Sequence, residues 1–345
     1  MHHRSWRRRA LLPATTALAV AAALTQTGAA PAAAAAHSTT VEVYDNFAKA
    51  GGYSLSDYGA KWANPYGPLE MAVHDTRGFS GNRFNVSAAP FTLAPDYSVF
   101  DHLKYIAIST KAFAVPAVGS VEISSTITAS TPGTQAGRVV HGTYTQSGLP
   151  WSAVALEGQQ AGAVMNVVDF STGQLFDWFI SGSRAFALIE RLPTNVTNLP
   201  GADYATDDPR YVGRAKMYTQ IVREAPAGPG PHAVSIRFSR DASGQGHADY
   251  YLDGALFAHV DHVGVPLDVQ GVGYTGTYPS NGPGEELGSR INSLAIGHGL
   301  FSLLDAFPFQ HPESPELSVN VPPSERAFGQ GAVASFDDFK VKTVR

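Results

Sequence analysis

Most of the chain after residue 36 consists of short stretches in which apolar and polar residues alternate, separated by turn residues. Residues 121–129 alternate over the length of a strand, and Val234, Ile236 and Phe238 share one side of residues 233–239. Alternation with a period of two places successive side chains on opposite faces of a β-strand. Each stretch therefore predicts a strand with one buried face.

Turn residues indicate how two of these strands are joined and how the chain closes. Asp253-Gly254, between two apolar stretches, is the pair that tolerates the positive φ of a tight hairpin turn. Residues 335–344 predict a closing strand with Phe339 and Val341 on one face. These features predict antiparallel pairing.

The remaining segments are poor in helical periodicity and rich in turn residues. Gly and Pro together account for 57 of the 345 residues. Residues 299–306 are the best candidate for a helix, and residues 215–222 predict one more strand. Three segments are loop-like, and long loops on a compact domain favour a binding surface: 192–231, 271–283 and 308–323. We therefore predict an all-β protein, a two-sheet antiparallel β-sandwich with long loops and little helix.

The first 36 residues have the composition of an export signal. They carry four arginines and no acidic residue, then a 14-residue apolar run from Leu11 to Leu24, then a stretch rich in alanine. Arg8-Arg9 before an apolar pair resembles a twin-arginine signal, and an ordinary secretory signal is the alternative. The apolar run is shorter than the ~20 residues that span a bilayer. We expect cleavage near residue 36, a single domain over 37–345, a secreted protein and no membrane span after cleavage.

Charge and cysteine content exclude several classes of function. Without residues 1–36 the chain has 20 basic and 29 acidic residues, a net charge of −9. Nucleic-acid binding depends on Lys and Arg side chains that neutralise phosphates, so a nucleic-acid partner is not expected. Cysteine is absent, which excludes thiol catalysis, zinc–thiolate sites and iron–sulfur clusters. The sequence does not indicate an oligomeric state.

Several segments, in their order along the chain, resemble concanavalin A-like lectin/glucanase domains. Residues 41–47 resemble the opening strand of such domains, residues 232–254 their central strand and Asp-Gly hairpin, and residues 336–341 their last strand. Residues 176–193 resemble a family of secreted actinobacterial proteins of this kind. The resemblance implies a jelly roll in which one sheet curves into a groove.

The resemblance also implies a structural calcium ion, although no cofactor is required. Members of the superfamily often hold Ca²⁺ between the first and the last strand, and by position Asp45 and Asp337 would be its carboxylate ligands. Calcium binds six to eight oxygen atoms, which backbone carbonyls help to supply. The alternative is that Asp45 caps a turn and Asp337 faces solvent.

Asp177 and Glu190 form the best candidate pair of catalytic carboxylates. The Glu-x-Asp-x-x-Glu motif of the glucanase branch is absent. If residues 181–184 form a four-residue turn, Asp177 lies diagonally opposite Glu190 on one face of a hairpin, at ~7–8 Å. Two carboxyl groups so placed can act as general acid and base. The alternative is a polar surface on which Glu190 pairs with Arg184 or Arg191.

Residues 216–220 carry the second catalytic candidate. The resemblance implies a lyase-like Tyr-x-Gln strand, with Tyr218 as acid/base and with Lys216 and Gln220 on the same face. Other parts of the lyase pattern are missing. The alternative is an ordinary strand whose residues Met217, Thr219 and Ile221 point inward.

Aromatic side chains in loop-like segments are candidates for ligand contacts. Together with Lys216 and Gln220, the predicted ligand-binding residues are Trp62, Trp151, Tyr211 and Tyr274. Our leading interpretation is a secreted protein that binds a glycan or another extracellular ligand in its concave groove. An enzyme on the same scaffold stays open: a glycoside hydrolase, a polysaccharide lyase or a small-molecule tailoring enzyme that uses Asp177/Glu190 or Tyr218. A structural role in the cell envelope is the third interpretation.

Overall fold

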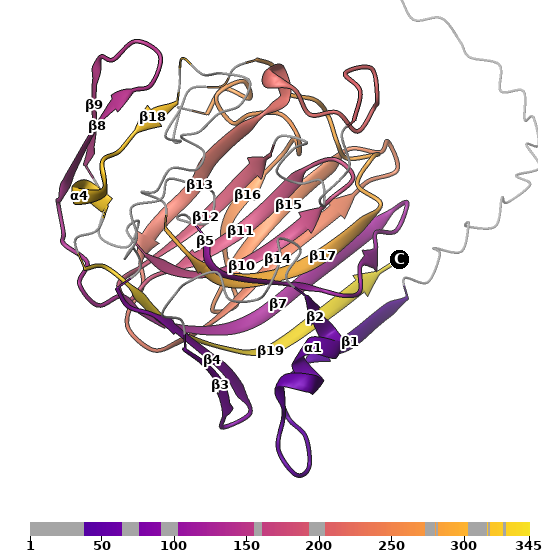
Figure 1. Ribbon diagram of the computed structural model, residues 1–345. Helices are drawn as coiled ribbons and strands as arrows, with labels where there is room; N and C mark the ends of the chain where they lie inside the picture. Colours follow the sequence, from indigo (N-terminus) through magenta and orange to yellow (C-terminus); the bar gives the residue numbers. More distant parts are fainter. Residues whose placement is uncertain are drawn as a thin grey trace, which may run out of the picture. The chain divides into compact units, whose positions relative to one another are not determined.

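A computed structural model describes ten parts of the chain, which form two large antiparallel sheets and one small sheet (Figure 1). The described residues are 38–63, 76–90, 103–154, 161–192, 204–272, 280, 282–302, 316, 318–326 and 329–345.

One of the two eight-stranded sheets is named sheet A. Its strand order is β16 (Ala255–Val260), β15 (Gly246–Leu252), β14 (Pro231–Arg240), β7 (Gly119–Ser130), β19 (Ala332–Val344), β4 (Arg83–Ala88) and β3 (Thr76–Ser80), and β1 (Thr39–Asp45) also pairs with β19. The Asp253-Gly254 turn between β15 and β16 has φ values of 51° and 82°, as its composition predicts.

The second eight-stranded sheet, sheet B, contains the predicted catalytic hairpin. Its order is β13 (Tyr218–Pro226), β12 (Arg184–Arg191), β11 (Gln174–Ile180), β10 (Gly162–Asp169), β17 (Ser293–Phe301), β5 (Leu103–Ser109) and β2 (Trp62–Ala63), and β6 (Phe113–Ala114) also pairs with β17. Residues 299–301 belong to β17, so the helix expected at 299–306 is wrong where the structure describes it.

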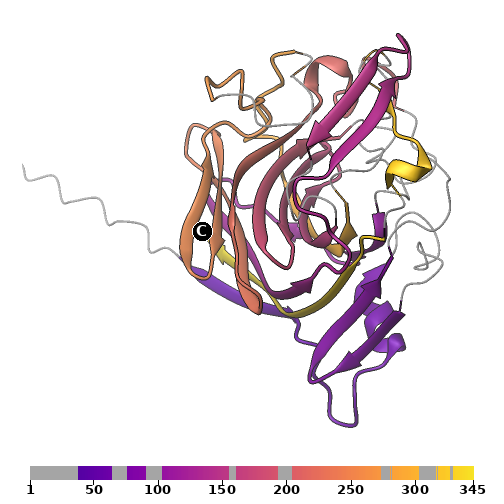
Figure 2. The same ribbon diagram turned by 90° about the vertical axis from the view of Figure 1, so that its left-hand side faces the viewer.

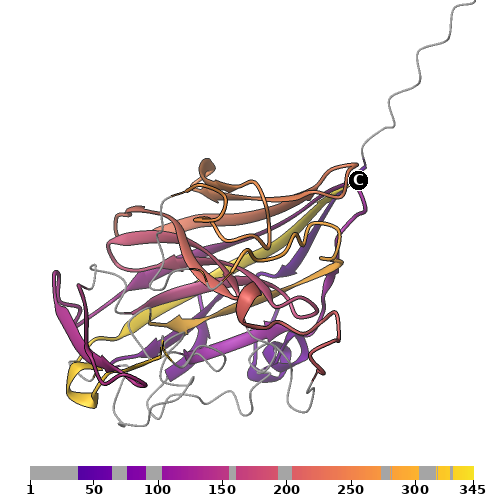
Figure 3. The ribbon, with the colours of Figure 1, turned by 90° about the horizontal axis from the view of Figure 1, so that it is seen from above.

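The smaller elements lie at the ends of the sandwich. A three-stranded sheet of β18 (Val319–Asn320), β8 (Val139–Tyr144) and β9 (Pro150–Val154) lies at the end opposite the C-terminus (Figures 1 and 3). Among the described residues, the helical elements are α1 (Leu55–Lys61), η1 (Arg214–Lys216) and α4 (Pro323–Arg326). The Ser54 side chain accepts a hydrogen bond from the Asp57 backbone N–H, and the Asp57 carboxylate accepts one from the Ser54 N–H. This reciprocal cap explains why a helix begins there.

Sheets A and B pack face to face as two curved layers (Figure 2). The side chains of Phe176 and Trp178 from sheet B meet Phe238 and Tyr250 from sheet A, and all four are fully buried. The indole N–H of Trp178 donates to the Ser235 carbonyl oxygen across the interface, at 3.0 Å. The predicted two-sheet antiparallel sandwich, with Phe176 and Trp178 facing its core, is therefore confirmed.

Candidate functional site

The face of sheet B that points away from sheet A carries a second buried cluster. Strand register fixes its rows, because directly paired residues project to the same face. Nine apolar side chains on this outer face are each less than one-tenth exposed: Ile106, Ile108, Val164, Val168, Phe179, Phe186, Leu188, Ala295 and Phe301. A sheet face with so many apolar side chains is a low-dielectric setting for any polar group placed in it.

Asp177 and Glu190 project from this outer face, as predicted. Leu175 pairs with Glu190 and Asp177 pairs with Leu188 across β11 and β12. Asp177 and Glu190 are thus diagonal neighbours, a relation in which Cα atoms lie ~7–8 Å apart. Their catalytic role stays a prediction, but the register brings the two acids together.

Burial raises the pKa of both carboxyl groups. Asp177 is 5% exposed, and burial raises its pKa from 3.8 to about 7, although one hydrogen bond from Asn166 lowers it. Burial also raises the pKa of Glu190 well above its usual value, and the nearby charge of Asp177 raises it further. Burial therefore favours the protonated form of both acids, and the repulsion between their charges disfavours ionising both at once.

The arginines that were the alternative partners of Glu190 pair with other acids. Arg184 donates to a Glu224 oxygen at 3.0 Å, and Arg191 lies 2.9 Å from Glu285. Within the described residues, no cation pairs with either Asp177 or Glu190. The polar-surface alternative, in which Glu190 is held by Arg184 or Arg191, is wrong.

Asn166 is a site residue that the sequence reasoning missed. It pairs with Asp177 across β10 and β11, and its Nδ2 donates a hydrogen bond to Asp177 Oδ1 at 2.5 Å. Its own Oδ1 is buried without a hydrogen-bond partner and lies beside Gly297, whose missing side chain leaves room for it. The available signal was a single amide inside the otherwise apolar stretch 163–168.

The structure does not place Tyr218 and Gln220 with the acid pair. Both point to the inner face of sheet B: Tyr218 is a core residue whose hydroxyl donates to Gln174 Oε1 at 3.0 Å, and burial raises its pKa. The Gln220 amide donates to Asp268 at 2.9 Å and accepts from the Leu267 backbone N–H at 2.5 Å. Both side chains form hydrogen bonds inside the protein, because the strand directs them inward.

The inward-facing alternative for this strand also needs correction. Ile221 pairs with Leu188 and packs against the outer cluster, and Thr219 pairs with Glu190. Residues Thr219 and Ile221 therefore lie on the outer face, opposite to the expected side.

Of the predicted ligand-binding aromatic residues, two are buried. Trp62 is 1% exposed and its indole donates to Asp45 at 2.8 Å, which makes it a core residue rather than a ligand contact. Trp151 is 9% exposed on β9. Tyr211 is half-buried, and its carbonyl oxygen lies 3.5 Å from Lys216 Nζ, so these two predicted residues do come together. Tyr274 lies outside the described residues.

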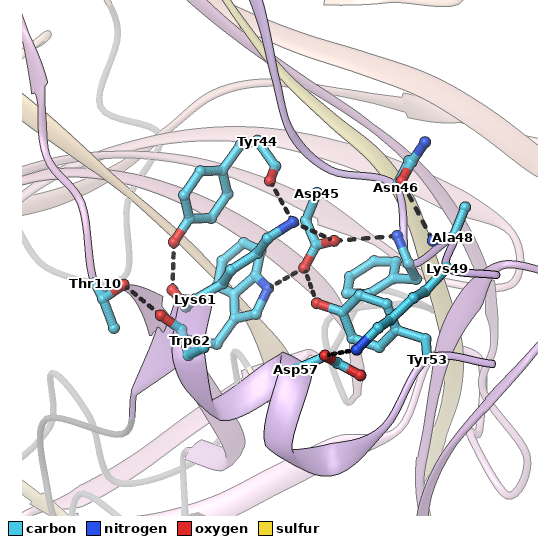
Figure 4. Close-up of polar contacts among 12 residues, drawn as sticks. Tyr44, Asp45, Asn46, Ala48, Lys49, Tyr53, Asp57, Lys61, Trp62 and Thr110 are labelled. Carbon is cyan, nitrogen blue, oxygen red and sulfur yellow. Dashed lines mark hydrogen bonds and ion pairs between the residues drawn. The ribbon is translucent and has the colours of Figure 1, made fainter. Parts of the chain in front are cut away.

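The Asp45 carboxylate is surrounded by protein donors rather than by further acids (Figure 4). Its Oδ1 accepts hydrogen bonds from the Phe47 N–H and Lys61 Nζ, and its Oδ2 accepts from the Tyr53 hydroxyl and the Trp62 indole. A carboxylate with four donors has little capacity left for a cation.

Asp337 has a different neighbour, Arg83, whose Nε lies 3.9 Å from its carboxylate. The part of the chain that the structure describes contains no group of three or more His, Asp or Glu side chains suited to a metal ion. The calcium ion stays a prediction of the resemblance, without a ligand set among these residues. Among the same residues, no helix is both long and apolar enough to cross a membrane.

Comparisons with known proteins found one family model and several distantly similar solved structures. A model described as "Family of unknown function (DUF6081)" matches residues 44–345. No curated protein matches the chain. Among solved structures, similarity extends to an endo-1,3-beta-glucanase from Streptomyces sioyaensis, with 10% identity, a TM-score of 0.40, and coverage of 91% of this chain and 99% of that one.

Two further solved structures are similar to a comparable degree. Beta-agarase B from Zobellia galactanivorans has 12% identity, a TM-score of 0.41, and coverage of 89% of this chain and 94% of its own. An endo-beta-1,4-glucuronan lyase from the fungus Trichoderma reesei has 10% identity, a TM-score of 0.36, and coverage of 81% and 91%. The two-sheet antiparallel sandwich that the resemblance implies is confirmed by the sheet topology itself. Similarities this distant carry no argument about an activity.

Proposed function

Because the chain belongs to DUF6081, a family of unknown function, its activity has to come from its own geometry, and we propose that it hydrolyses glycosidic bonds with Asp177 and Glu190. One observation supports this proposal above the others: the buried carboxyl group of Asp177 and the partly buried one of Glu190 share one sheet face without a counter-charge among the described residues. Burial raises the pKa of both, and the charge of Asp177 further disfavours ionisation of Glu190. Pairs of acids whose environments separate their protonation states are typical of acid–base catalysis.

In this proposal the two acids have different roles. Glu190, whose pKa is raised by burial and by the charge of Asp177, is the general acid that donates its proton to the leaving glycosidic oxygen. Asp177, in its ionised form, either activates a water molecule or attacks the sugar itself, and the separation of the carboxyl groups in the substrate complex decides between these. Asn166 orients Asp177 and stabilises its ionised form through the 2.5 Å hydrogen bond. Leu188 and Phe179, on the same face, give the pair an apolar surrounding.

A purely sugar-binding role has less support than it had from the sequence. The predicted stacking rings Trp62 and Trp151 are buried, and Trp62 is engaged with Asp45. The lyase alternative loses its acid/base residue, because Tyr218 lies in the core between the sheets. Export of the protein remains part of the proposal, which places the substrate outside the cell.

Release of reducing ends from a panel of neutral and acidic polysaccharides tests the proposal. Asp177→Asn and Glu190→Gln should each lower the rate by ~10²–10⁴-fold, the usual contribution of one general acid or base. Glu42→Gln, which removes an exposed carboxylate paired with Lys111, is the matched control and should keep full activity. Full activity in both acid variants would overturn the assignment, and no product from any polysaccharide would overturn hydrolysis altogether.

A further inference from the structure

Three cationic side chains surround the single carboxylate of Glu285 near one end of sheet B. Arg191 Nη2 lies 2.9 Å from Glu285 Oε2, and Lys216 Nζ lies 3.3 Å from the same oxygen. Arg290 pairs with the other oxygen, Oε1. This cluster is separate from Asp177 and Glu190, and none of its members takes part in the proposed proton transfers.

Arg191 neutralises Glu285 from the inside of the protein. Its side chain is 0% exposed, its Nε donates to the Thr172 carbonyl oxygen at 3.0 Å, and its Nη1 is buried without a hydrogen-bond partner. Burial lowers the pKa of Arg191, and the charge of Glu285 opposes that effect. One buried guanidinium thus already balances the one carboxylate, so the other two cations exceed what Glu285 requires.

A second described acid, Asp169, interacts with the cluster and does not restore the balance. Asp169 interacts electrostatically with Arg290, but its carboxylate accepts hydrogen bonds from the Ser171 and Thr172 side chains, and burial raises its pKa. Even with Asp169 fully ionised, three cations face two carboxylates. Among these described side chains, the cations therefore outnumber the carboxylates by one, and an excess of positive charge that is partly buried favours binding of an anion.

Lys216 is the cation best placed to meet an external anion. Its side chain is 34% exposed and that of Arg290 is 29% exposed, so both reach the surface while Arg191 does not. Apart from Glu285, Lys216 Nζ contacts the Tyr211 carbonyl oxygen at 3.5 Å, a distance too long for a strong hydrogen bond. Its ammonium group therefore retains donors for a ligand.

We propose that Lys216 and Arg290 bind a carboxylate group of the ligand, which makes the substrate an acidic glycan. This inference rests on the proposed glycosidase function for the identity of the ligand, although the cation cluster itself does not. Lys216 precedes Thr219 by three residues, and Thr219 pairs with Glu190. Three residues span at most about 10 Å of chain, so the cluster lies at the same end of β12 and β13 as Glu190, although Arg191 anchors it on the inner side of sheet B and Glu190 projects from the outer face.

Binding of tri-galacturonate and of its methyl ester, measured by titration calorimetry, tests this inference. The ester removes the negative charges and adds only a methyl group to each carboxyl, and the wild-type protein should bind the acid at least about tenfold more tightly than the ester. Lys216→Met should remove most of this preference, and Lys216→Arg should keep it. Lys340→Met, which removes an equal charge from the exposed pair with Asp338, is the control and should bind as the wild type.

The acid-pair variants separate this inference from the proposed function. Asp177→Asn should lose hydrolysis and still bind tri-galacturonate with the wild-type affinity. Equal affinity for the acid and its ester, or no binding of either, overturns the anion site and leaves hydrolysis of neutral glycans untouched. Charge-selective binding without cleavage of any glycan would sustain the anion site and overturn the hydrolase.

Discussion

Replacing Asp177 by Asn should stabilise the protein at alkaline pH while it abolishes activity. The side chain is 5% exposed and its single hydrogen-bond donor among the described residues is Asn166. Its pKa in the folded state, about 7, lies above the usual 3.8 of an unfolded chain. The folded protein therefore holds this proton more tightly than the unfolded chain does, and stability falls as pH rises from 3.8 through 7.

The size of the effect follows from this shift. A difference of about 3 pKa units corresponds to about 4 kcal/mol of stability that is lost once the pH is above 7. Asn has the same shape and still accepts the hydrogen bond from Asn166, but it does not titrate. At pH 8 the Asp177→Asn variant should therefore gain up to about 4 kcal/mol, whereas at pH 4 the two proteins should differ little.

Urea unfolding at pH 4 and pH 8, followed by tryptophan fluorescence, measures this difference as a change in the free energy of unfolding. Glu42→Gln is the control, because an exposed ion pair contributes ~0–1 kcal/mol at either pH. A variant that is less stable than the wild type at pH 8, or a difference in stability that does not depend on pH, would refute the reasoning that burial disfavours ionisation of Asp177.

Three further outcomes follow from the structure. Hydrolysis should rise with pH through about 7, as Asp177 ionises, and a pH–rate profile checks this. His298 is fully buried, and burial lowers its pKa to about 3, so the wild type should lose stability as the pH falls from 6.5 toward 3. Urea titrations of His298→Phe should show a smaller loss between pH 6 and pH 4, by about 1.4 kcal/mol per pH unit. Asp45→Ala should destabilise the fold by ~3–5 kcal/mol in thermal or urea unfolding, because it leaves Lys61 and Trp62 without their acceptor.

The sheet architecture was accessible from the sequence because each strand carries its own periodicity. Val234, Ile236 and Phe238 face the core as their spacing predicts, and Asp253-Gly254 forms the expected turn. The prediction of a helix at 299–306 was wrong because the glycines and apolar residues of β17 are buried on both faces of the sheet. A strand buried on both faces lacks the apolar–polar alternation that would have identified it. Helix α1 was missed because seven residues give too little periodicity, although Ser54 and Asp57 carried its cap signal.

The site was predictable only where it depended on strand register. Turn length alone fixed the diagonal relation of Asp177 to Glu190, since one turn sets the pairing of a whole hairpin. The sheet faces of Tyr218 and Gln220 could not be assigned in the same way. Polar and apolar residues alternate in this strand, but the pattern does not indicate which of the two faces packs against the core. The contacts of Trp62 and Asp45 join β1, α1 and β2, and no local pattern encodes such distant partners.

Two buried carboxylates, Asp45 and Asp177, differ in the number of hydrogen-bond donors around them, and this difference bears on function. Asp45 accepts hydrogen bonds from four donors, one of them the ammonium group of Lys61. Asp177 has one neutral donor and a second acid beside it. A carboxylate that serves only the fold is expected to be saturated in the manner of Asp45, because an unsaturated one destabilises the folded state. The acid pair destabilises the folded state, and packing does not explain why it is there. The proposed acid–base role on the outer face of sheet B does explain it.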